Sequence, residues 1–548
     1  MKNKKMFLYI FATITGIALI GGLLIYQHCF SLHAKLDRYL TNLEQQGKLS
    51  ASVLVAQKGK NLLCKGYGKA NYEHMVSNTP KTKFDIGSIT KQFTAMAIIQ
   101  LVQAEKLKTS DTVASIFPDY PRGNEITIYH LLTNTSGLPH DWEAANTGSG
   151  SPTNLVAVID RFKNTPLAFK PGDKYQYSNC GFTLLAAIIE KVSGQSFENY
   201  LHDHIFAPIG MNDSGMLHNA TIITNRAQGY HVADAGLFNA PCYEPGTYIG
   251  AGELYSTILD MYRWDRSLYT DQLLTKNFRM QLWKPNLENY GMGWVISQFH
   301  DHACVWHNGG SHDCHNMFMR FPDDDVCIII LGNFDLDSTP YIENIGIQLA
   351  GIVFGKRSPK KDIIVPDPAA YDELLGQYKT NDGQIVTTIK DGDRFYVQRS
   401  GEGAHRMMSL SPTRFVEEYQ PVEISFIKDA QGNIEKLVLQ LNEEKIEAQK
   451  INNNGRTVIL LSPEKLQECV GAYTFDKKEL VMSIKIYHGA LFCQLPGQPA
   501  FQLYPTSATE FFMRDVDAQI SFYKDTNGRI TKLILHQNGA YQETVKVV

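Results

Sequence analysis

The stretch that decides the fold is Phe84-Asp-Ile-Gly-Ser-Ile-Thr-Lys91, which leads directly into a long apolar segment. Residues 92–107 have apolar positions on nearly all sides of a helix, so we expect this helix to be buried. Ser88 follows Gly87 at the helix start, and Lys91 comes one turn later on the same face. The spacing therefore predicts that a serine hydroxyl and a lysine amine meet at the edge of a buried core.

The chemistry of this pair depends on its surroundings. A serine hydroxyl is a weak nucleophile until a base takes its proton, and a lysine amine in a desolvated pocket has a pKa low enough to help. The N–H groups at a helix start also favour the negative oxygen that forms during acyl transfer. Because Ser-x-x-Lys is a short pattern, the simpler interpretation is a helix-capping serine beside a solvated lysine.

A phenol and an amide lie at the start of a second predicted helix. Residues 170–179 are rich in turn formers and lead into the apolar segment 180–193, for which Gly194 is the expected C-cap. This arrangement places Tyr177 and Asn179 at the point where that helix begins. Both are candidate site residues.

A strand that contains two glycines supplies the third element. Trp306-His-Asn-Gly-Gly310 comes before the continuous apolar run Val326–Leu331, which is typical of a central strand. We expect the glycine-containing segment to be an edge strand beside the core. Glycines in a strand allow a ligand to approach closely and expose N–H groups. His307, Gly309 and Gly310 are therefore candidate binding residues.

Serine with lysine, then tyrosine with asparagine, then a strand with glycine is the order of penicillin-recognising serine hydrolases. The region from about Leu36 to Phe354 resembles the β-lactamase-related serine hydrolases, nearest the class C β-lactamases and the D-aminopeptidases. Ser88-Ile-Thr-Lys91 matches the first motif and Tyr177-Ser-Asn179 the second, and His307-Asn-Gly309 stands where the antibiotic-hydrolysing enzymes have Lys-Thr-Gly. Three accessory segments also match, namely residues 126–138, 250–256 and 290–294.

The resemblance implies both a fold and a catalytic role for each motif. The expected fold is a mixed α/β (α+β) β-lactamase/transpeptidase-like domain, with an antiparallel sheet beside a helical subdomain and the site between them. Ser88 is the expected nucleophile, and Lys91 and Tyr177 share its proton. The N–H groups of Ser88 and Gly310 are the expected oxyanion donors. No cofactor is expected.

The resemblance also bears on the substrate. Asn179 is expected to orient a substrate amide, with His307 and Gly309 on the far side of the pocket. Because His307 replaces the strand lysine, a dedicated β-lactamase is disfavoured, and a D-amino-acid peptidase or an esterase is favoured. The expected partner is a small-molecule, short-peptide or cell-wall-derived substrate, with covalent acylation by β-lactams. The alternative is a catalytically weak penicillin-binding or scaffold protein of the same fold.

A cluster of histidines and cysteines suggests a competing metal site. Zinc favours these ligands at short spacing. Alternate residues of a strand face opposite ways, so only some of the cluster can converge, and part of it overlaps the third motif. We therefore expect no metal. The cluster comprises His300, Asp301, His302, Cys304, His307, His312, Cys314 and His315.

Beyond a charged, proline-containing linker at 355–368, the chain contains an internal repeat. Ile424–Leu437 recurs as Ile520–Leu533 at an offset of 96 residues, with a glycine-containing turn in each copy. Regular strand spacing predicts a small antiparallel barrel or sandwich in each copy, at 369–455 and 464–548. D-aminopeptidases that resemble this chain carry two β-barrels after the catalytic domain. This implies barrels that restrict the site to small substrates, and the alternative is spacers or envelope-binding modules.

The N-terminus carries a targeting signal. Lys2, Lys4 and Lys5 precede 21 uncharged residues from Met6 to Tyr26, long enough to cross a bilayer as a helix. We expect residues 1–30 to be a signal anchor, or else a cleaved signal peptide, and the catalytic domain to occupy 31–357. A lipoprotein anchored at Cys29 is disfavoured by the bulky residue before it. The bulk of the chain is therefore expected to be extracytoplasmic, periplasmic or at the cell surface, with N-terminal membrane insertion.

Composition narrows the remaining classes. Apolar residues make up 43% of the 548 residues and charged residues 20%, which excludes a chain that is disordered throughout. Lys and Arg total 52 against 56 Asp and Glu, without a basic block, so we expect no nucleic-acid partner. Residues 140–154 are rich in Gly, Ser and Asn and follow a family segment near the site mouth. We interpret them as a mobile rim with Trp142 as an apolar contact, or else as a plain surface loop.

Overall fold

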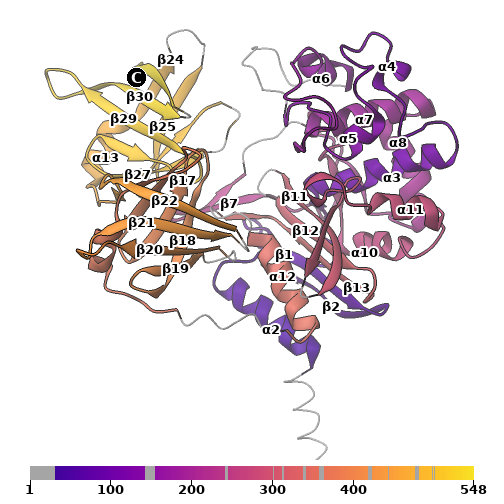
Figure 1. Ribbon diagram of the computed structural model, residues 1–548, viewed down its shortest axis with the longest axis horizontal. Helices are drawn as coiled ribbons and strands as arrows, with labels where there is room; N and C mark the ends of the chain where they lie inside the picture. Colours follow the sequence, from indigo (N-terminus) through magenta and orange to yellow (C-terminus); the bar gives the residue numbers. More distant parts are fainter. Residues whose placement is uncertain are drawn as a thin grey trace, which may run out of the picture. The chain divides into compact units, whose positions relative to one another are not determined.

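The structure is a computed structural model with two compact units (Figure 1). The N-terminal segment 1–30, Trp142 and its loop, and His300 and His312 lie outside the described residues. The described residues are 31–141, 155–240, 245–299, 301–311, 314–336, 341–356, 363–417, 422–441, 444–475, 480–496, 498, 500–537 and 539–547. The first unit holds the residues up to 229, 244–334 and 345–358, and the second holds 230–243, 335–344 and 359–548.

A six-stranded antiparallel sheet forms the centre of the first unit, in the order β10-β11-β12-β13-β1-β2. Every residue of β13 is buried, as the apolar run predicts, and β13 pairs with β1 in a register that sets Val55 opposite Ile328. β1 and β2 pair antiparallel around a turn at Lys58 and Gly59. The strands are β1 (Ala51–Gln57), β2 (Lys60–Tyr67), β10 (Val295–Phe299), β11 (His302–Ser311), β12 (Cys314–Phe321) and β13 (Val326–Gly332).

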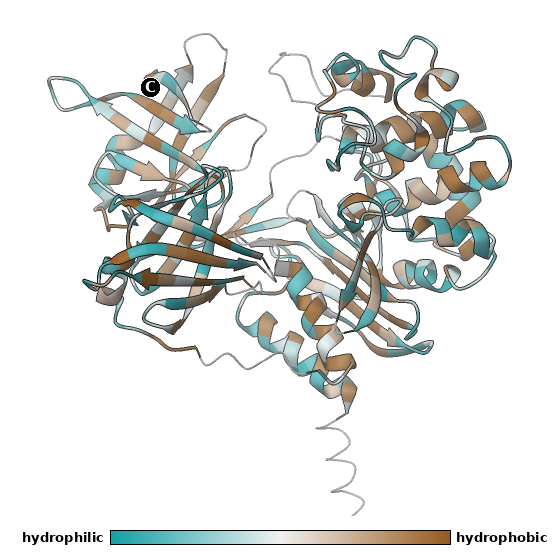
Figure 2. Ribbon diagram, in the orientation of Figure 1, coloured by the Kyte–Doolittle hydropathy of each residue, from teal (hydrophilic) through white to brown (hydrophobic). Residues whose placement is uncertain are grey.

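Helices cover both faces of this sheet. On one face, α12 (Tyr341–Val353) packs on β12, where Gly346 faces the side chains of Met317 and Met319, and α2 (Leu32–Gln45) packs on β2. On the other face, Leu54, Phe318 and Ile329 join a large core shared with the helical subdomain. Figure 2 shows apolar residues running through the central strands and the helices beside them. None of the helices in the described ranges combines the length and apolar character needed to span a membrane.

The helical subdomain contains the two buried helices expected from the sequence. The first is α3, which begins at Thr90 and ends at Gln103, earlier than predicted, because Glu105 adopts a left-handed φ of 55°. The second, α7 (Asn179–Ser193), ends at Gly194 with φ 75°, as expected of a C-cap glycine. The other helices and turns of this unit are η1 (Gly87–Ile89), α4 (Val113–Ile116), α5 (Ile128–Leu132), α6 (Leu155–Phe162), α8 (Phe197–Leu201), η2 (His202–Phe206), α9 (Ala207–Ile209), α10 (Ile258–Ser267), α11 (Lys276–Leu282) and η3 (Leu287–Asn289). Short strands complete it: β3 (Lys69–Asn71), β4 (Val76–Ser77), β5 (Phe84–Asp85), β6 (Gly215–Met216) and β9 (Leu254–Ser256).

The glycine-containing strand, β11, differs from its prediction. It is second in the sheet, between β10 and β12, so the expectation of an edge strand is wrong for the strand as a whole. The pairing with β10 ends at Trp306, however, whereas the pairing with β12 continues to Ser311. The second half of β11 therefore extends beyond its neighbour, which is where the predicted site residues lie.

The second unit contains two antiparallel barrels of eight described strands each, so each copy of the repeat is a barrel and not a sandwich. In the first, β15 pairs with both β16 and β22 and closes the cylinder, and the second closes in the same way. The first barrel comprises β15 (Gln377–Thr380), β16 (Ile385–Asp391), β17 (Arg394–Arg399), β18 (Ala404–Ser411), β19 (Arg414–Glu417), β20 (Val422–Lys428), β21 (Ile434–Leu441) and β22 (Glu444–Asn452), with η4 (Pro368–Leu374) before it and β23 (Arg456–Thr457) parallel to β16. The second comprises β24 (Gly471–Phe475), β25 (Val481–Tyr487), β26 (Ala490–Gln494), β27 (Ala500–Pro505), β28 (Glu510–Phe512), β29 (Ala518–Lys524), β30 (Ile530–Gln537) and β31 (Ala540–Lys546), after α13 (Pro463–Cys469).

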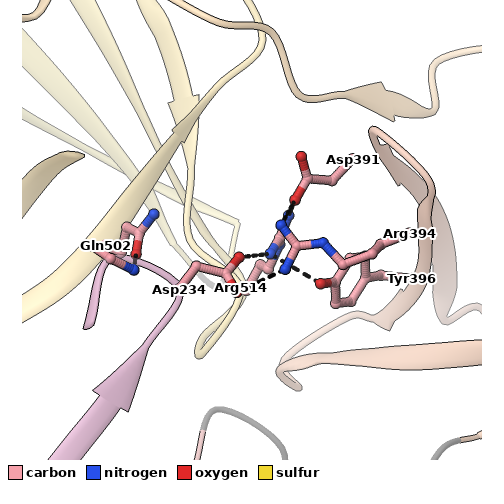
Figure 3. A network of polar contacts seen from close by, with 7 residues as sticks. Asp234, Asp391, Arg394, Tyr396, Gln502 and Arg514 are labelled. Carbon is pink, nitrogen blue, oxygen red and sulfur yellow. Dashed lines mark hydrogen bonds and ion pairs between the residues drawn. The ribbon is translucent and has the colours of Figure 1, made fainter. Parts of the chain in front are cut away.

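A hairpin from the middle of the sequence belongs to the barrel unit. Its strands, β7 (Tyr230–Ala233) and β8 (Gly236–Asn239), form a three-stranded sheet with β14 (Phe334–Leu336). At its turn, Asp234 accepts hydrogen bonds from Arg394 of the first barrel at 2.8 Å and from Arg514 of the second at 2.7 Å (Figure 3). One carboxylate thus holds arginines of both barrels.

Candidate active site

Ser88 lies in a tight turn that is fixed to strand β11. The Asp85 carboxylate accepts a hydrogen bond from the Gly87 N–H at 3.0 Å and another from the Ser311 hydroxyl at 2.6 Å. Gly87 has a φ of 52°, and a Cβ there would lie 2.8 Å from the Gly310 carbonyl oxygen. Only glycine fits this turn without strain. The result is that the backbones of Ser88 and Gly310 are held next to each other.

The Lys91 side chain is fully buried beneath this turn, one helical turn after Ser88. Its Nζ lies 3.1 Å from the Ser88 hydroxyl, 2.7 Å from the Asn179 side-chain oxygen and 2.8 Å from the Ala251 carbonyl oxygen. Burial lowers the pKa of Lys91 well below 10.5, with a smaller opposing effect from the Asp141 carboxylate. The neutral amine is therefore the favoured form.

The three contacts of Lys91 limit where its N–H bonds can point. A neutral amine has two N–H bonds and one lone pair. The oxygens of Asn179 and Ala251 only accept, so Lys91 donates to both. An ammonium donates to the Ser88 oxygen as well, whereas the neutral amine turns its lone pair to the Ser88 hydroxyl. Asn179 is held in this orientation because its amide nitrogen donates to the Asp141 carboxylate at 2.7 Å. The amine is thus positioned to accept the Ser88 proton.

Tyr177 lies over the same amine. The Lys91 nitrogen is 4.7 Å from the centre of the Tyr177 ring. Burial raises the pKa of Tyr177 above its ordinary value, and the Ser88 hydrogen bond lowers it by less. Burial therefore favours the protonated phenol.

His307 closes the opposite wall as a neutral ring. Burial, with the nearby Lys91 amine as a smaller cause, lowers the pKa of His307 to about 3. Its Nδ1 lies 2.6 Å from the Asn308 carbonyl oxygen and therefore carries the proton. Its Nε2 is then an acceptor, and it takes a hydrogen bond from the Tyr290 hydroxyl at 3.1 Å. The ring centres of Tyr177 and His307 are 6.1 Å apart, so both rings line one space.

The two glycines of β11 have different surroundings. A Cβ on Gly309 would lie only 2.0 Å from the Ile86 carbonyl oxygen, so this position has no room for a side chain. A Cβ on Gly310 would meet nothing closer than a His315 ring carbon at 3.8 Å. Asn316 of β12 fastens the contact, because its amide donates to the carbonyl oxygens of both Asp85 and Gly309. Gly309 is thus required for close packing, whereas Gly310 faces open space.

The three accessory segments support these groups from outside. In the first, Asn134 accepts the backbone N–H of Ser178, beside Tyr177. In the second, Ala251 accepts from Lys91, as described above. In the third, a Cβ on Gly293 would lie 2.6 Å from the Lys91 carbonyl oxygen, so glycine is needed there for packing. Each segment therefore positions a site residue.

The structure brings Ser88, Lys91, Tyr177 and Asn179 into direct contact, with His307, Gly309 and Gly310 around them. Sequence reasoning missed the positioning residues Asp85, Asp141 and Asn316. Asp85 stands next to the first motif, so it could have been recognised from the sequence as an acidic group beside a helix start. Asp141 and Asn316 carry no comparable local signal, because their partners come from distant parts of the chain.

The histidine and cysteine cluster does not converge in the part of the chain that the structure describes. There, no group of three or more His, Cys, Asp or Glu residues is arranged to hold a metal ion. His302 is paired with Asp324 at 2.8 Å and stacked on Phe354, away from His307, which belongs to the site.

Comparison with known proteins agrees with this geometry. The family model described as Beta-lactamase matches residues 36–351, more than half of the chain. The chain therefore belongs to the Beta-lactamase family. Penicillin-binding protein 4* of Bacillus subtilis (strain 168) is 29% identical over 421 residues, which cover 71% of this chain and 93% of that protein. The predicted serine hydrolase of the β-lactamase-related family is confirmed at this level.

Solved structures share the fold over much of the chain. The octameric penicillin-binding protein homologue from Pyrococcus abyssi superposes with a TM-score of 0.56 at 25% identity, over 76% of this chain and 99% of that one. D-amino acid amidase from Ochrobactrum anthropi SV3 superposes with a TM-score of 0.54 at 21% identity, over 60% of this chain and 99% of that one, a likeness in fold. The predicted fold class, a mixed α/β catalytic domain followed by two antiparallel barrels, is confirmed.

Proposed function

We propose that the protein is an exported serine hydrolase that cleaves an amide or ester bond of a small substrate through an acyl-enzyme on Ser88. The observation that carries this proposal is the buried Lys91 amine, which donates to the oxygens of Asn179 and Ala251 and lies 3.1 Å from the Ser88 hydroxyl. A base in this position is what a serine nucleophile requires.

Acylation begins when Ser88 Oγ attacks the substrate carbonyl carbon. The hydroxyl proton passes to the lone pair of Lys91, and the carbonyl oxygen becomes negative. The backbone N–H groups of Ser88 and Gly310 are the donors for this oxygen, because the packing of Gly87 on Gly310 holds the two backbones together. Asn179 orients the substrate amide beside them.

Collapse of this intermediate releases the leaving group. Tyr177, as a protonated phenol beside Lys91, gives its proton to the departing nitrogen or oxygen and regains one from the Lys91 ammonium. The acyl group is then an ester on Ser88. Water completes the cycle: it attacks the ester, Lys91 accepts its proton, and Ser88 recovers its hydrogen as the acid leaves.

The wall at His307 favours particular substrates. A neutral imidazole whose Nε2 accepts from Tyr290 offers no positive charge to a substrate carboxylate. A D-amino-acid peptide, a D-amino-acid amide or a short ester therefore suits this site better than a penicillin does. The likeness in fold to D-amino acid amidase supports this class.

The test combines a serine-directed probe with a substrate panel. A fluorescent fluorophosphonate and a fluorescent penicillin are reacted with the full chain, and hydrolysis is measured for D- and L-amino-acid amides, short esters and a chromogenic cephalosporin. We expect labelling of the Ser88 peptide in the mass spectrum and turnover of small amides or esters. Ser88→Ala abolishes both, whereas Ser115→Ala, an exposed serine in the same unit, changes neither.

Two results would overturn the proposal. Unchanged hydrolysis by Ser88→Ala would show that the chemistry lies elsewhere. Labelling at Ser88 without turnover of any amide or ester would instead identify a catalytically weak penicillin-binding protein.

Export rests on residues 1–30, which lie outside the described residues. Lys2, Lys4 and Lys5 before an uncharged run support insertion with the rest of the chain outside the cytoplasm. Fusion of residues 1–30 to a reporter that folds only after export tests this part separately. A fusion that is synthesised but whose reporter stays inactive would contradict export and leave the catalytic proposal untouched.

A further inference from the structure

The first barrel contains a cavity outside the catalytic unit. Its volume is about 170 Å³. Eight-stranded barrels of this size have room for one small ligand. The cavity is lined by Val397, Arg399, Glu402, His405, Met407, Glu417, Val422, Ile424 and Leu439.

The lining has an apolar wall and a polar mouth. Alternate residues of a strand face the barrel interior, so Val397 and Arg399 share the inner face of β17. In the same way Met407 and His405 share the inner face of β18. Val397 and Met407 are each only 4% exposed, whereas Arg399 and His405 are partly exposed. The cavity therefore runs from a charged rim into an apolar interior.

The second barrel is an internal control for this arrangement. The two barrels keep the 96-residue offset in their strand pairing, since Val397 lies opposite His405 as Cys493 lies opposite Phe501. The next pair of strands keeps it too, because Ser409 lies opposite Phe415 as Pro505 lies opposite Phe511. Positions in the two barrels can therefore be compared one by one.

The mouth is where the two copies differ. Arg399, His405 and Glu417 of the first barrel correspond to Leu495, Phe501 and Met513 of the second. These three apolar residues pack into the core of the second barrel. Packing alone thus favours apolar side chains at these positions, and buried charges cost stability unless they are paired. The first barrel thus keeps charged side chains at positions where packing alone favours apolar ones.

Hydrogen bonds at the mouth define what a ligand would offer. The nearly buried Glu417 carboxylate lies 3.1 Å from His405 Nδ1, and this contact raises the pKa of His405. Arg399 is paired with Glu402 at 3.3 Å and donates to Gln384 at 3.0 Å. Both carboxylates of the mouth therefore already have cationic partners.

Arg399 and His405 each keep one N–H group for a ligand. Within the described residues, the buried Nε of Arg399 has no hydrogen-bond partner. Because His405 uses Nδ1 for Glu417, its Nε2–H is the ring nitrogen available to a ligand. Two N–H donors on cationic groups complement a carboxylate, and the wall behind them complements an apolar body.

We propose that the first barrel binds a small monocarboxylate with an apolar body, its carboxylate at Arg399 and His405 and its body against Val397, Met407 and Ile424. A cavity of about 150 Å³ accommodates benzene, so a body of this size, aromatic or short aliphatic, fits. The site is independent of the proposed hydrolase reaction.

Titration of the full chain with benzoate and with hexanoate by calorimetry tests this assignment. We expect both acids to bind with one site per chain, and benzyl alcohol and benzylamine to bind at least tenfold more weakly. Arg399→Leu and His405→Phe, which introduce the residues of the second barrel, should each weaken benzoate binding at least tenfold. Arg414→Leu, an exposed arginine of the same barrel, should leave the affinity unchanged.

Several outcomes would overturn the proposal. These are no heat of binding with either acid, equal binding of benzyl alcohol, or unchanged affinity in His405→Phe. Retained acylation of Ser88 and an undiminished melting temperature in each variant show that any loss of binding is not a loss of fold. The triple variant Arg399→Leu/His405→Phe/Glu417→Met, which gives the first barrel the mouth of the second, should abolish binding and raise the melting temperature.

Discussion

At the scale of single residues, the protonation of Lys91 determines what the site can do. A protonated ammonium would donate to Ser88, Asn179 and Ala251 alike and would leave Ser88 without a base. The buried position avoids this by making the charged form costly. The same burial that places the amine in the core thus prepares it for catalysis.

The first prediction is a pH dependence of acylation. Because burial lowers the pKa of Lys91, the amine becomes protonated only as the pH falls through that lowered value. The rate of Ser88 labelling should therefore rise with pH and level off well below 10.5. Lys91→Arg, which stays charged, should lose about 10²–10⁴-fold in rate. Stopped-flow measurement of probe labelling against pH checks this, and a rate still rising near pH 10.5 would contradict it.

The second prediction concerns Asp141, which orients the Asn179 amide. Without this carboxylate the amide is free to rotate and present its N–H₂ group to Lys91, a contact between two donors. We expect Asp141→Ala to slow acylation roughly tenfold, about 1.4 kcal/mol, the scale of one lost hydrogen bond to a charged group. Labelling kinetics measure the effect. Asp141→Asn, which keeps an acceptor oxygen, should recover most of the rate, and failure to do so would count against an orienting role.

At the scale of elements, the site depends on the packing contact between the Ser88 turn and β11. The turn comes from one end of the catalytic sequence and the strand from the other. Asp85 and Asn316 fasten them, one from each side. Glycine at positions 87 and 309 lets the backbones meet.

The third prediction separates the two glycines of β11. Gly309→Ala places a methyl group 2.0 Å from the Ile86 carbonyl oxygen, so the strand and the turn must move apart. We expect a loss of about 1–3 kcal/mol in unfolding free energy, the usual cost of overpacking, together with slower acylation. Gly310→Ala, with its nearest neighbour at 3.8 Å, is the matched control and should keep the stability. Chemical denaturation and probe labelling test both variants. Equal stability of the two would refute the claim that the contact between the turn and β11 requires glycine at position 309.

Much of this site could be predicted from local sequence. Ser88 with Lys91, and Tyr177 with Asn179, each lie at a helix start, and helix starts are visible in apolar periodicity. The direction of the hydrogen bonds was not predictable, because it depends on Asp141 and on the Ala251 carbonyl oxygen. These groups reach Lys91 only through the tertiary fold. Whether β11 has one neighbour or two was likewise set by where β10 ends, which no local pattern encodes.

The fold, like the site, could be predicted from the sequence only in part. The repeat at 96 residues was visible in the sequence, but closure into a barrel depends on β15 pairing with both β16 and β22. The hairpin of β7 and β8 was not predicted at all as part of the barrel unit. Its partners, Arg394 and Arg514, are 160 and 280 residues away from Asp234, so no short window of sequence contains the interaction.

At the scale of the whole molecule, Asp234 connects the two barrels within their unit (Figure 3). Arg514 is nearly buried, and its charge is shared between Asp234 and Asp391. The Phe238 ring of the hairpin packs on Phe492 with a centroid distance of 4.9 Å, and the backbone N–H of Ala235 donates to Gln502. The hairpin therefore contributes polar and apolar contacts at once.

The fourth prediction is the effect of Asp234→Ala. Both arginines lose one partner, but Asp391 remains and Asp234 is itself one-third exposed, so the cost is below that of a fully buried pair. We expect a loss of about 1–3 kcal/mol in unfolding free energy, measured by denaturant titration of the full chain. Asp393→Ala, an exposed acid of the first barrel, is the control. A melting curve for Asp234→Ala that matches this control would mean that the hairpin is not held by its carboxylate.

The position of this hairpin also has a consequence for synthesis on the ribosome. Asp234 emerges 280 residues before Arg514, and at about 5–20 residues per second that interval lasts roughly 14–56 s. During this time Phe238 has not yet met Tyr487 or Phe492, which are still to be translated. A chain that ends after the catalytic sequence would never contain the barrel residues. Its hairpin would therefore lack the barrel partners of Asp234 and Phe238. The nascent chain therefore depends on its C-terminal barrels to cover a hairpin surface that is synthesised well before them.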